Sequence, residues 1–205
     1  MRTRHFVYGF TLLLLASLVS PSHAADPRAG PSAFVAELVQ KGLLSLTTES
    51  TSSADRQRRL GEFLDEDFDV PRIAGFVVGH YWQTATEAER QSFTSVFHDF
   101  LVRVYSQRFN DYDGASFKVI GQHVEDATST VVFTEMSQPS SGQAMRVEWR
   151  VVDRSGYRII DISAGGVSLA KVQREDFMSA LRRNGGSLSN LVQQLQEKVA
   201  MLDSH

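Results

Sequence analysis

The residues that could carry chemistry are few and widely spaced along the chain. Three histidines, His80, His98 and His123, fall on different predicted elements, and none has the spacing that pairs ligands in a metal site. An acid and a base acting on one substrate would have to come from Tyr105, Asp161 and His123, which are far apart in sequence. The chain has no GxSxG, P-loop or GxGxxG motif. The sequence therefore predicts no catalytic residue, no metal and no cofactor.

Residues 143–177 predict a unit of two strands and a helix around which the rest of the chain is organised. The unit begins with a two-residue alternation of apolar and polar side chains. The apolar side chains of its first strand are those of Met145, Val147, Trp149 and Val151. Such a period is typical of a half-buried strand. Residues 153–156 form a short polar turn that ends in glycine, and residues 157–163 return as a second strand. Gly165 and Gly166 end that strand, and a helix-period run follows Ser168.

The strongest predicted helix follows Thr86 and Glu89, which have the spacing of a capping box. Its apolar stripe consists of Phe93, Val96, Phe97, Phe100, Leu101, Val104 and Tyr105. A stripe of this spacing normally faces a protein core. Its richness in phenylalanine also fits a helix that lines a wide cavity, so both interpretations stay open at this point.

The remaining patterns complete an α+β prediction. Helices are predicted to begin at Pro31 and near Ala54, the second with Arg56 in solvent, and a short one spans residues 72–78. Residues 117–124 and 130–136 alternate as strands, and an amphipathic helix follows the glycines after Asn184. We therefore expect an antiparallel sheet of about four strands with several helices packed on it, enclosing a deep apolar cavity.

The N-terminus has the order of a secretory signal peptide. Arg2 and Arg4 precede an apolar run that is too short to span a bilayer, and a small-residue cleavage site follows it. Cleavage after Ala24 would leave 181 of the 205 residues as one domain, residues 25–205. It would lower the formal charge from −3 to −5, since Arg2 and Arg4 are the only charged residues removed. A mildly acidic chain without a basic run gives no reason to expect nucleic acid as a partner, and with no cysteine it forms no disulfide.

Several short motifs occur in a fixed order after about residue 63: Phe68-Asp69, Gly79-His80-Tyr81-Trp82, Gly156-Tyr157-Arg158, Asp161-Ile162, Gly166-Val167-Ser168-Leu169 and Arg174-Glu175-Asp176-Phe177. Together they resemble the signature of the MlaC family, also called the toluene-tolerance family. The ordered set covers most of the chain after about Phe63. Two departures from the usual pattern, Gln173 and Val78-Gly79-His80, suit a divergent branch such as the hopanoid-cluster relatives (HpnM).

The resemblance implies a periplasmic carrier that holds the acyl chains of a phospholipid, or of a hopanoid-type lipid, and shuttles it between membrane complexes. It also implies an inner-membrane MCE/ABC transporter complex and an outer-membrane lipoprotein complex as partners, and a monomer in solution. A lipid with about 30 acyl methylenes faces a transfer cost of about 25 kcal/mol in water, so a shuttle must replace nearly all of its apolar surroundings. Such a carrier needs no catalytic residue, and we expect this protein not to be an enzyme.

Residues of the patterned elements and of the motifs make up the predicted cavity lining: Phe76, Tyr81, Trp82, Phe93, Phe97, Phe100, Leu101, Val104, Tyr105, Met145, Val147, Trp149, Val151, Ile160, Ile162 and Val167. Arg174 has two competing interpretations, a structural ion pair with Asp161 or Glu175 and a contact with a lipid phosphate at the cavity mouth. Two other function classes stay open on the sequence. One is a small enzyme of the ketosteroid-isomerase kind acting in a cone-shaped pocket, and the other is an exported adaptor that binds only other proteins.

Overall fold

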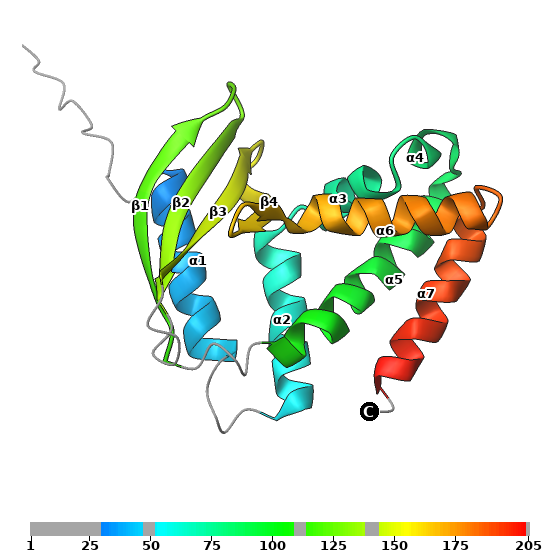
Figure 1. The fold of residues 1–205 in the computed structure, drawn as a ribbon, viewed down its shortest axis with the longest axis horizontal. Coiled ribbons are helices and arrows are strands. Elements are labelled where there is room, and N and C mark those ends of the chain that lie inside the picture. Colours follow the sequence, from blue (N-terminus) through cyan, green and yellow to red (C-terminus); the bar gives the residue numbers. More distant parts are fainter. Residues whose placement is uncertain (1–29, 47–51, 109–113, 138–143, 204–205) are drawn as a thin grey trace, which may run out of the picture.

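A curved antiparallel sheet lies at one end of the molecule and a group of helices at the other (Figure 1). The structure is a computed structural model that describes residues 30–46, 52–108, 114–137 and 144–203. The predicted signal peptide, residues 1–24, lies outside the described residues. The helices are α1 (Pro31–Leu46), α2 (Ser53–Asp67), α3 (Val70–Val78), α4 (Tyr81–Thr84), α5 (Glu87–Ser106), α6 (Leu169–Arg183) and α7 (Leu188–Asp203). The strands are β1 (Ser116–Val124), β2 (Ser129–Ser137), β3 (Ala144–Asp153), β4 (Tyr157–Ala164) and β5 (Val167–Ser168).

Short polar side chains set the starts of the helices. Thr86 and Glu89 form a reciprocal capping box at α5, in which the Glu89 carboxylate accepts from the Thr86 backbone and the Thr86 hydroxyl accepts from the Glu89 backbone. Ser168 accepts from the backbone N–H of Lys171 at 3.1 Å and so begins α6. Helix α3 ends at Gly79, whose φ of 58° is a conformation that favours glycine. None of the helices in the described part of the chain is long and apolar enough to cross a bilayer.

The five strands follow one another in the sheet in the order of the sequence, each antiparallel to the next. Trp149 in β3 is paired with Val132 in β2 on one side and with Ile162 in β4 on the other, which places its ring near the centre of the sheet. The pairing shifts register near Val119 in β1 and again after Arg150 in β3. Such irregularities increase local twist and help the sheet to curve.

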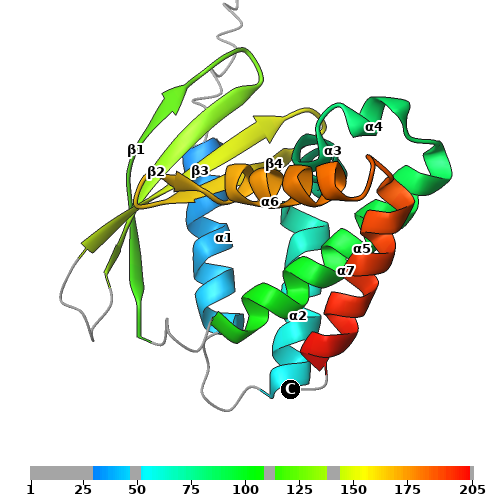
Figure 2. The ribbon, with the colours of Figure 1, turned by 45° about the vertical axis from the view of Figure 1, so that its right-hand side comes forward.

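Helix α1 packs against the sheet, α2 lies between α1 and α5, and α6 crosses above them to reach α7 (Figures 1 and 2). Helix α1 contacts β1 and β2, and the Phe34 ring lies 5.8 Å from the Tyr157 ring at the start of β4. The end of α2 is joined to β4 by a parallel bridge between Phe68 and Ile159, where the backbone of Asp69 donates to Ile159 at 3.0 Å. This bridge fixes the distance between α2 and the sheet.

A compact aromatic cluster fills the space between α5 and α6. Phe93 and Phe97 stack with centroids 5.7 Å apart, and Phe177 of α6 meets both of them and Phe100 edge-on at 5.7–6.0 Å. Phe93 and Phe97 are fully buried. Offset and edge-on pairs of this kind add stability beyond the area that they bury. The helical half of the molecule therefore has a solid core of its own.

The predicted α+β class and antiparallel sheet are confirmed, with three differences in detail. The sheet has a fifth strand, β5, which is only two residues long and gave no detectable alternation. The single-turn helix α4 was not predicted. Arg56 was expected in solvent but is only 7% exposed, because its Nε donates to the carbonyl of Leu46 at 3.0 Å and so satisfies the end of α1.

Candidate functional site

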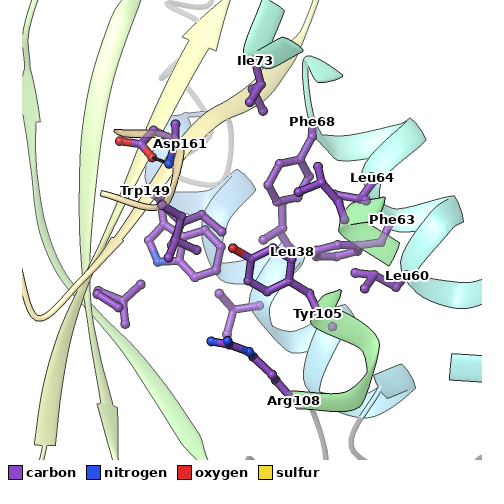
Figure 3. A pocket seen from close by; sticks show the side chains of 18 of the residues that line it. Leu38, Leu60, Phe63, Leu64, Phe68, Ile73, Tyr105, Arg108, Trp149 and Asp161 are labelled. Carbon is purple, nitrogen blue, oxygen red and sulfur yellow. Dashed lines mark hydrogen bonds between the residues drawn. The ribbon is translucent and has the colours of Figure 1, made fainter. Parts of the chain in front are cut away.

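An apolar cavity of about 350 Å³ lies between the sheet and the helices (Figure 3). Its size falls in the range of pockets that bury a sizeable part of an organic ligand. On the helical side much of the wall comes from α1 and α2, through Leu38, Val39, Gly42 and Leu46 of α1 and Leu60, Phe63 and Leu64 of α2. These are the inward stripes of two amphipathic helices, so the same spacing that makes them helical also supplies the wall.

The sheet side of the cavity is made by alternate residues of its strands. Met145, Val147 and Trp149 of β3 stand side by side with Met136 of β2, because side chains two apart in a strand share one face. Ile160 and Ile162 of β4 extend this surface toward α6. The two thioethers add wall that can adapt its shape to what it contacts.

A buried hydrogen bond fixes the orientation of the Trp149 ring. The indole Nε1–H donates to the hydroxyl of Thr134 at 2.9 Å, and that hydroxyl donates to the Val147 carbonyl at 3.3 Å. Thr134 is 1% exposed and Trp149 is 8% exposed. Since an unpaired indole N–H is costly in an apolar site, this bond satisfies the polar end of the ring and leaves its apolar body to face the cavity.

Four side chains with polar groups interrupt the apolar lining: Tyr105, Arg108, Asp161 and Gln173. The Asp161 carboxylate accepts from the Ser168 hydroxyl at 2.7 Å and from the Ala170 backbone at 3.1 Å, so it serves the start of α6. Tyr105 and Arg108 come from the end of α5 and from the turn after it, and the guanidinium lies 5.7 Å from the Tyr105 ring centroid. The polar groups of the cavity thus sit at separate places along its wall.

Eight of the sixteen residues expected to line a cavity do line this one. They are Phe97, Leu101, Tyr105, Met145, Val147, Trp149, Ile160 and Ile162. On α5 the cavity-facing residues recur every four positions, which is one edge of the predicted stripe. On β3 and β4 they are the alternating apolar residues themselves.

Four of the other eight are packed into the core. Phe93 and Phe100 face Phe177 rather than the cavity, since α6 crosses that side of α5. Val104 is partly buried against the core. Val151 is 1% exposed and lies beyond the register shift of β3, where it pairs with Ile159. The phenylalanine-rich stripe thus divides between the core and the cavity.

The last four lie away from the cavity at the surface of the helical half or at a turn. Phe76 is 43% exposed and lies under the Arg174 guanidinium. Tyr81 packs against Gly186, and Trp82 packs against Gly75 beneath the guanidinium of Arg90. Val167 is 55% exposed in the two-residue strand β5. These four side chains therefore pack between helices or face solvent, and none of them lines the cavity.

Sequence reasoning missed the contribution of α1 and α2 to the cavity. Leu38, Leu60, Phe63 and Leu64 follow an inward stripe that the sequence shows, but the stripe does not say whether it faces a core or a cavity. Arg108 gave no signal, because it stands outside every periodic pattern.

Arg174 braces two helices. Its Nη1 donates to the carbonyl of Phe76, and its guanidinium lies 4.9 Å from the Phe76 ring centroid. A Cβ placed on Gly79 would approach its Nη2 to 2.8 Å, so the glycine makes room for it. The considered ion pairs with Asp161 and Glu175 do not occur among the described residues. Arg174 instead satisfies the C-terminal end of α3 from the side of α6.

The three loose acid–base candidates do not converge. Tyr105 and Asp161 both line the cavity, but His123 is exposed on β1. His98 is near the carboxylates of Asp65 and Asp99, at 3.4 and 3.7 Å, on the face of α5 that packs against α2. Within the described ranges no three His, Cys, Asp or Glu side chains are grouped so that they could hold a metal ion.

Comparison with known proteins agrees with this geometry. The family model described as MlaC protein matches residues 36–197. The chain belongs to the MlaC family. Its fold is also similar to that of a phospholipid-binding protein from Ralstonia solanacearum that was solved in complex with a phospholipid. That match has a TM-score of 0.74 at 22% sequence identity and covers 85% of this chain and 99% of the other.

Family membership also decides between the function classes left open by the sequence. MlaC proteins are periplasmic lipid-binding carriers rather than enzymes. The prediction that this chain is not an enzyme is confirmed on that ground.

Proposed function

We propose that this protein is a periplasmic carrier that takes the acyl chains of a phospholipid into the cavity between its sheet and its helices. The observation that carries the proposal is the lining itself, in which side chains from α1, α2, α5 and the sheet form an almost continuous apolar wall. About 25 kcal/mol opposes the transfer of two acyl chains into water, so a carrier lowers the barrier by offering apolar surroundings of this kind. The phospholipid in the Ralstonia solanacearum protein supports the same ligand class.

The wider assignment rests on the family. The mature protein would be a single domain, residues 25–205, exported by a signal peptide cleaved after Ala24, and would act as a monomer. It would exchange lipid with an inner-membrane MCE/ABC transporter complex and an outer-membrane lipoprotein complex. A hopanoid-type lipid is the competing ligand, and it is distinguished from a phospholipid by mass.

Native mass spectrometry of the protein, purified from periplasmic extract without detergent, tests the proposal. We expect a bound species with the mass of a phospholipid. Leu101→Trp should reduce the bound fraction, because the larger ring would occupy the cavity, while the volume-conserving Leu101→Met should retain it. Wild-type protein with no bound lipid, or equal loading of the folded Trp and Met variants, would contradict the proposed use of the cavity.

A further inference from the structure

One end of the cavity carries a cation that the apolar wall does not require. Arg108 is the exposed residue among the described residues that line the cavity, whereas every other one is buried or half-buried. A residue that both lines a cavity and is exposed lies where the cavity meets solvent. Arg108 therefore marks an opening of the cavity at the end of α5.

Among the described residues, no side chain or backbone group forms a hydrogen bond or an ion pair with the polar groups at this opening. Within the described part of the chain no carboxylate pairs with Arg108, and its guanidinium lies over the Tyr105 ring. The Tyr105 hydroxyl is directed into the cavity toward Trp149 (Figure 3) and makes no hydrogen bond to any described residue. By contrast, the Asp161 carboxylate is engaged by Ser168 and Ala170. The guanidinium of Arg108 and the hydroxyl of Tyr105 are thus available to bind a ligand at one end of the apolar cavity.

A lipid with a phosphodiester matches this arrangement. Its acyl chains require the apolar wall, and its phosphate lies where the chains end and water begins. A guanidinium offers two parallel N–H donors to phosphate oxygens, and a phenol can donate to an ester carbonyl or glycerol oxygen nearby. We propose that Arg108, with Tyr105 beside it, recognises the phosphodiester of the bound lipid at the cavity mouth, a step that rests on the proposed carrier function.

This assignment has a consequence for ligand choice. Glycerophospholipids with a headgroup alcohol all have the phosphodiester, so Arg108 selects for the phosphate and leaves the outer headgroup free. A lipid of similar apolar volume without a phosphate loses this contact and keeps only the contacts with the wall. The alternative role of Arg108 is structural, a cover for the Tyr105 ring, and that role predicts an effect on stability without an effect on lipid choice.

The test is a competition between two lipids with identical acyl chains. Mature protein is incubated with phosphatidylcholine vesicles that carry equal amounts of labelled dioleoylphosphatidylglycerol and dioleoylglycerol, and the ratio of the two labels on the protein is measured. We expect Arg108→Gln to lower this ratio about tenfold relative to wild type, equivalent to ~1.4 kcal/mol. Because both proteins load from the same vesicles, the membrane affinities of the two lipids cancel in the comparison. Arg108→Lys, which keeps the charge without the fork, should fall between them.

The matched control is Arg154→Gln, which removes an exposed arginine in the turn between β3 and β4, outside the cavity lining. It should leave the ratio unchanged. A ratio unchanged in both Arg108 variants while dioleoylglycerol still loads would overturn the role of Arg108 and leave the carrier function standing. Loading of neither lipid by wild type would instead refute the carrier function. Millimolar inorganic phosphate should not alter the ratio, and if it abolishes the preference, the site is one for free phosphate.

Discussion

The buried bond between Trp149 and Thr134 offers the sharpest test of how the cavity wall is held. Thr134→Val keeps the shape of the side chain and removes the hydroxyl that accepts from the indole at 2.9 Å. The indole N–H is then left without an acceptor. Because residue 134 is only 1% exposed, water does not replace the lost hydroxyl. Leaving such a buried donor unsatisfied costs ~1–3 kcal/mol. In a chain of this length each kcal/mol lowers the Tm by about 2–4 °C.

Urea unfolding of a double-mutant cycle measures this bond directly. In a Trp149→Phe background no indole donor remains, so we expect Thr134→Val to cost ~1 kcal/mol less there than in wild type. Thr130→Val is the matched control, because Thr130 lies four residues away on the same face of β2 and makes no side-chain hydrogen bond to any described residue. It should change stability by less than about 0.5 kcal/mol. Additive effects of the Thr134 and Trp149 substitutions would refute the proposed bond.

Four further outcomes follow from other parts of the chain. Arg174→Ala should lower stability by about 1–2 kcal/mol, through loss of the contacts with Phe76, and leave lipid loading intact; loss of loading in a stable variant would contradict the brace. Gly79→Ala should also destabilise in urea, since its φ is 58° and its Cβ would meet Arg174, and an unchanged midpoint would contradict this packing. Burial raises the pKa of the Asp67 carboxyl above 3.8, so its stabilising contribution is present below pH 3.8 and is lost as the pH rises through the raised pKa. Asp67→Asn should therefore be the more stable protein at neutral pH, with an advantage that shrinks below pH 3.8 in urea titrations, whereas a constant advantage would exclude this titration as the cause. N-terminal sequencing of protein from the periplasm should begin at Ala25, and recovery of Met1 would refute the cleavage.

The elements could be predicted because their causes are local. The capping box of Thr86 and Glu89, the alternation around Trp149 and the glycines that end α6 are each decided within a few residues. The neighbours of each strand were also accessible, since hairpins join consecutive strands in an antiparallel sheet. These features determined the fold class without any knowledge of distant contacts.

The division of apolar residues between core and cavity could not be predicted, because it depends on which element crosses which face. Phe93 and Phe97 belong to one stripe, yet only Phe97 also reaches the cavity, because Phe177 arrives from α6 on the other side. Arg56 looked like a solvent residue beside two other arginines, but the end of α1 draws its side chain inward. Whether such a side chain lies in the core, in the cavity wall or in solvent depends on contacts between segments far apart in sequence.

The aromatic cluster explains how the protein can tolerate its cavity. Around an apolar cavity of about 350 Å³ the wall side chains have fewer protein neighbours than side chains in a close-packed core, which lowers the stability of the fold. The stacked and edge-on rings of Phe93, Phe97, Phe100 and Phe177 concentrate tight packing beside the cavity, between α5 and α6, and Phe97 belongs to both. A ligand that fills the void binds only the folded state and so returns part of this cost as stability. Binding of a lipid in the cavity should therefore raise the Tm of the protein, by an amount that grows with the lipid concentration.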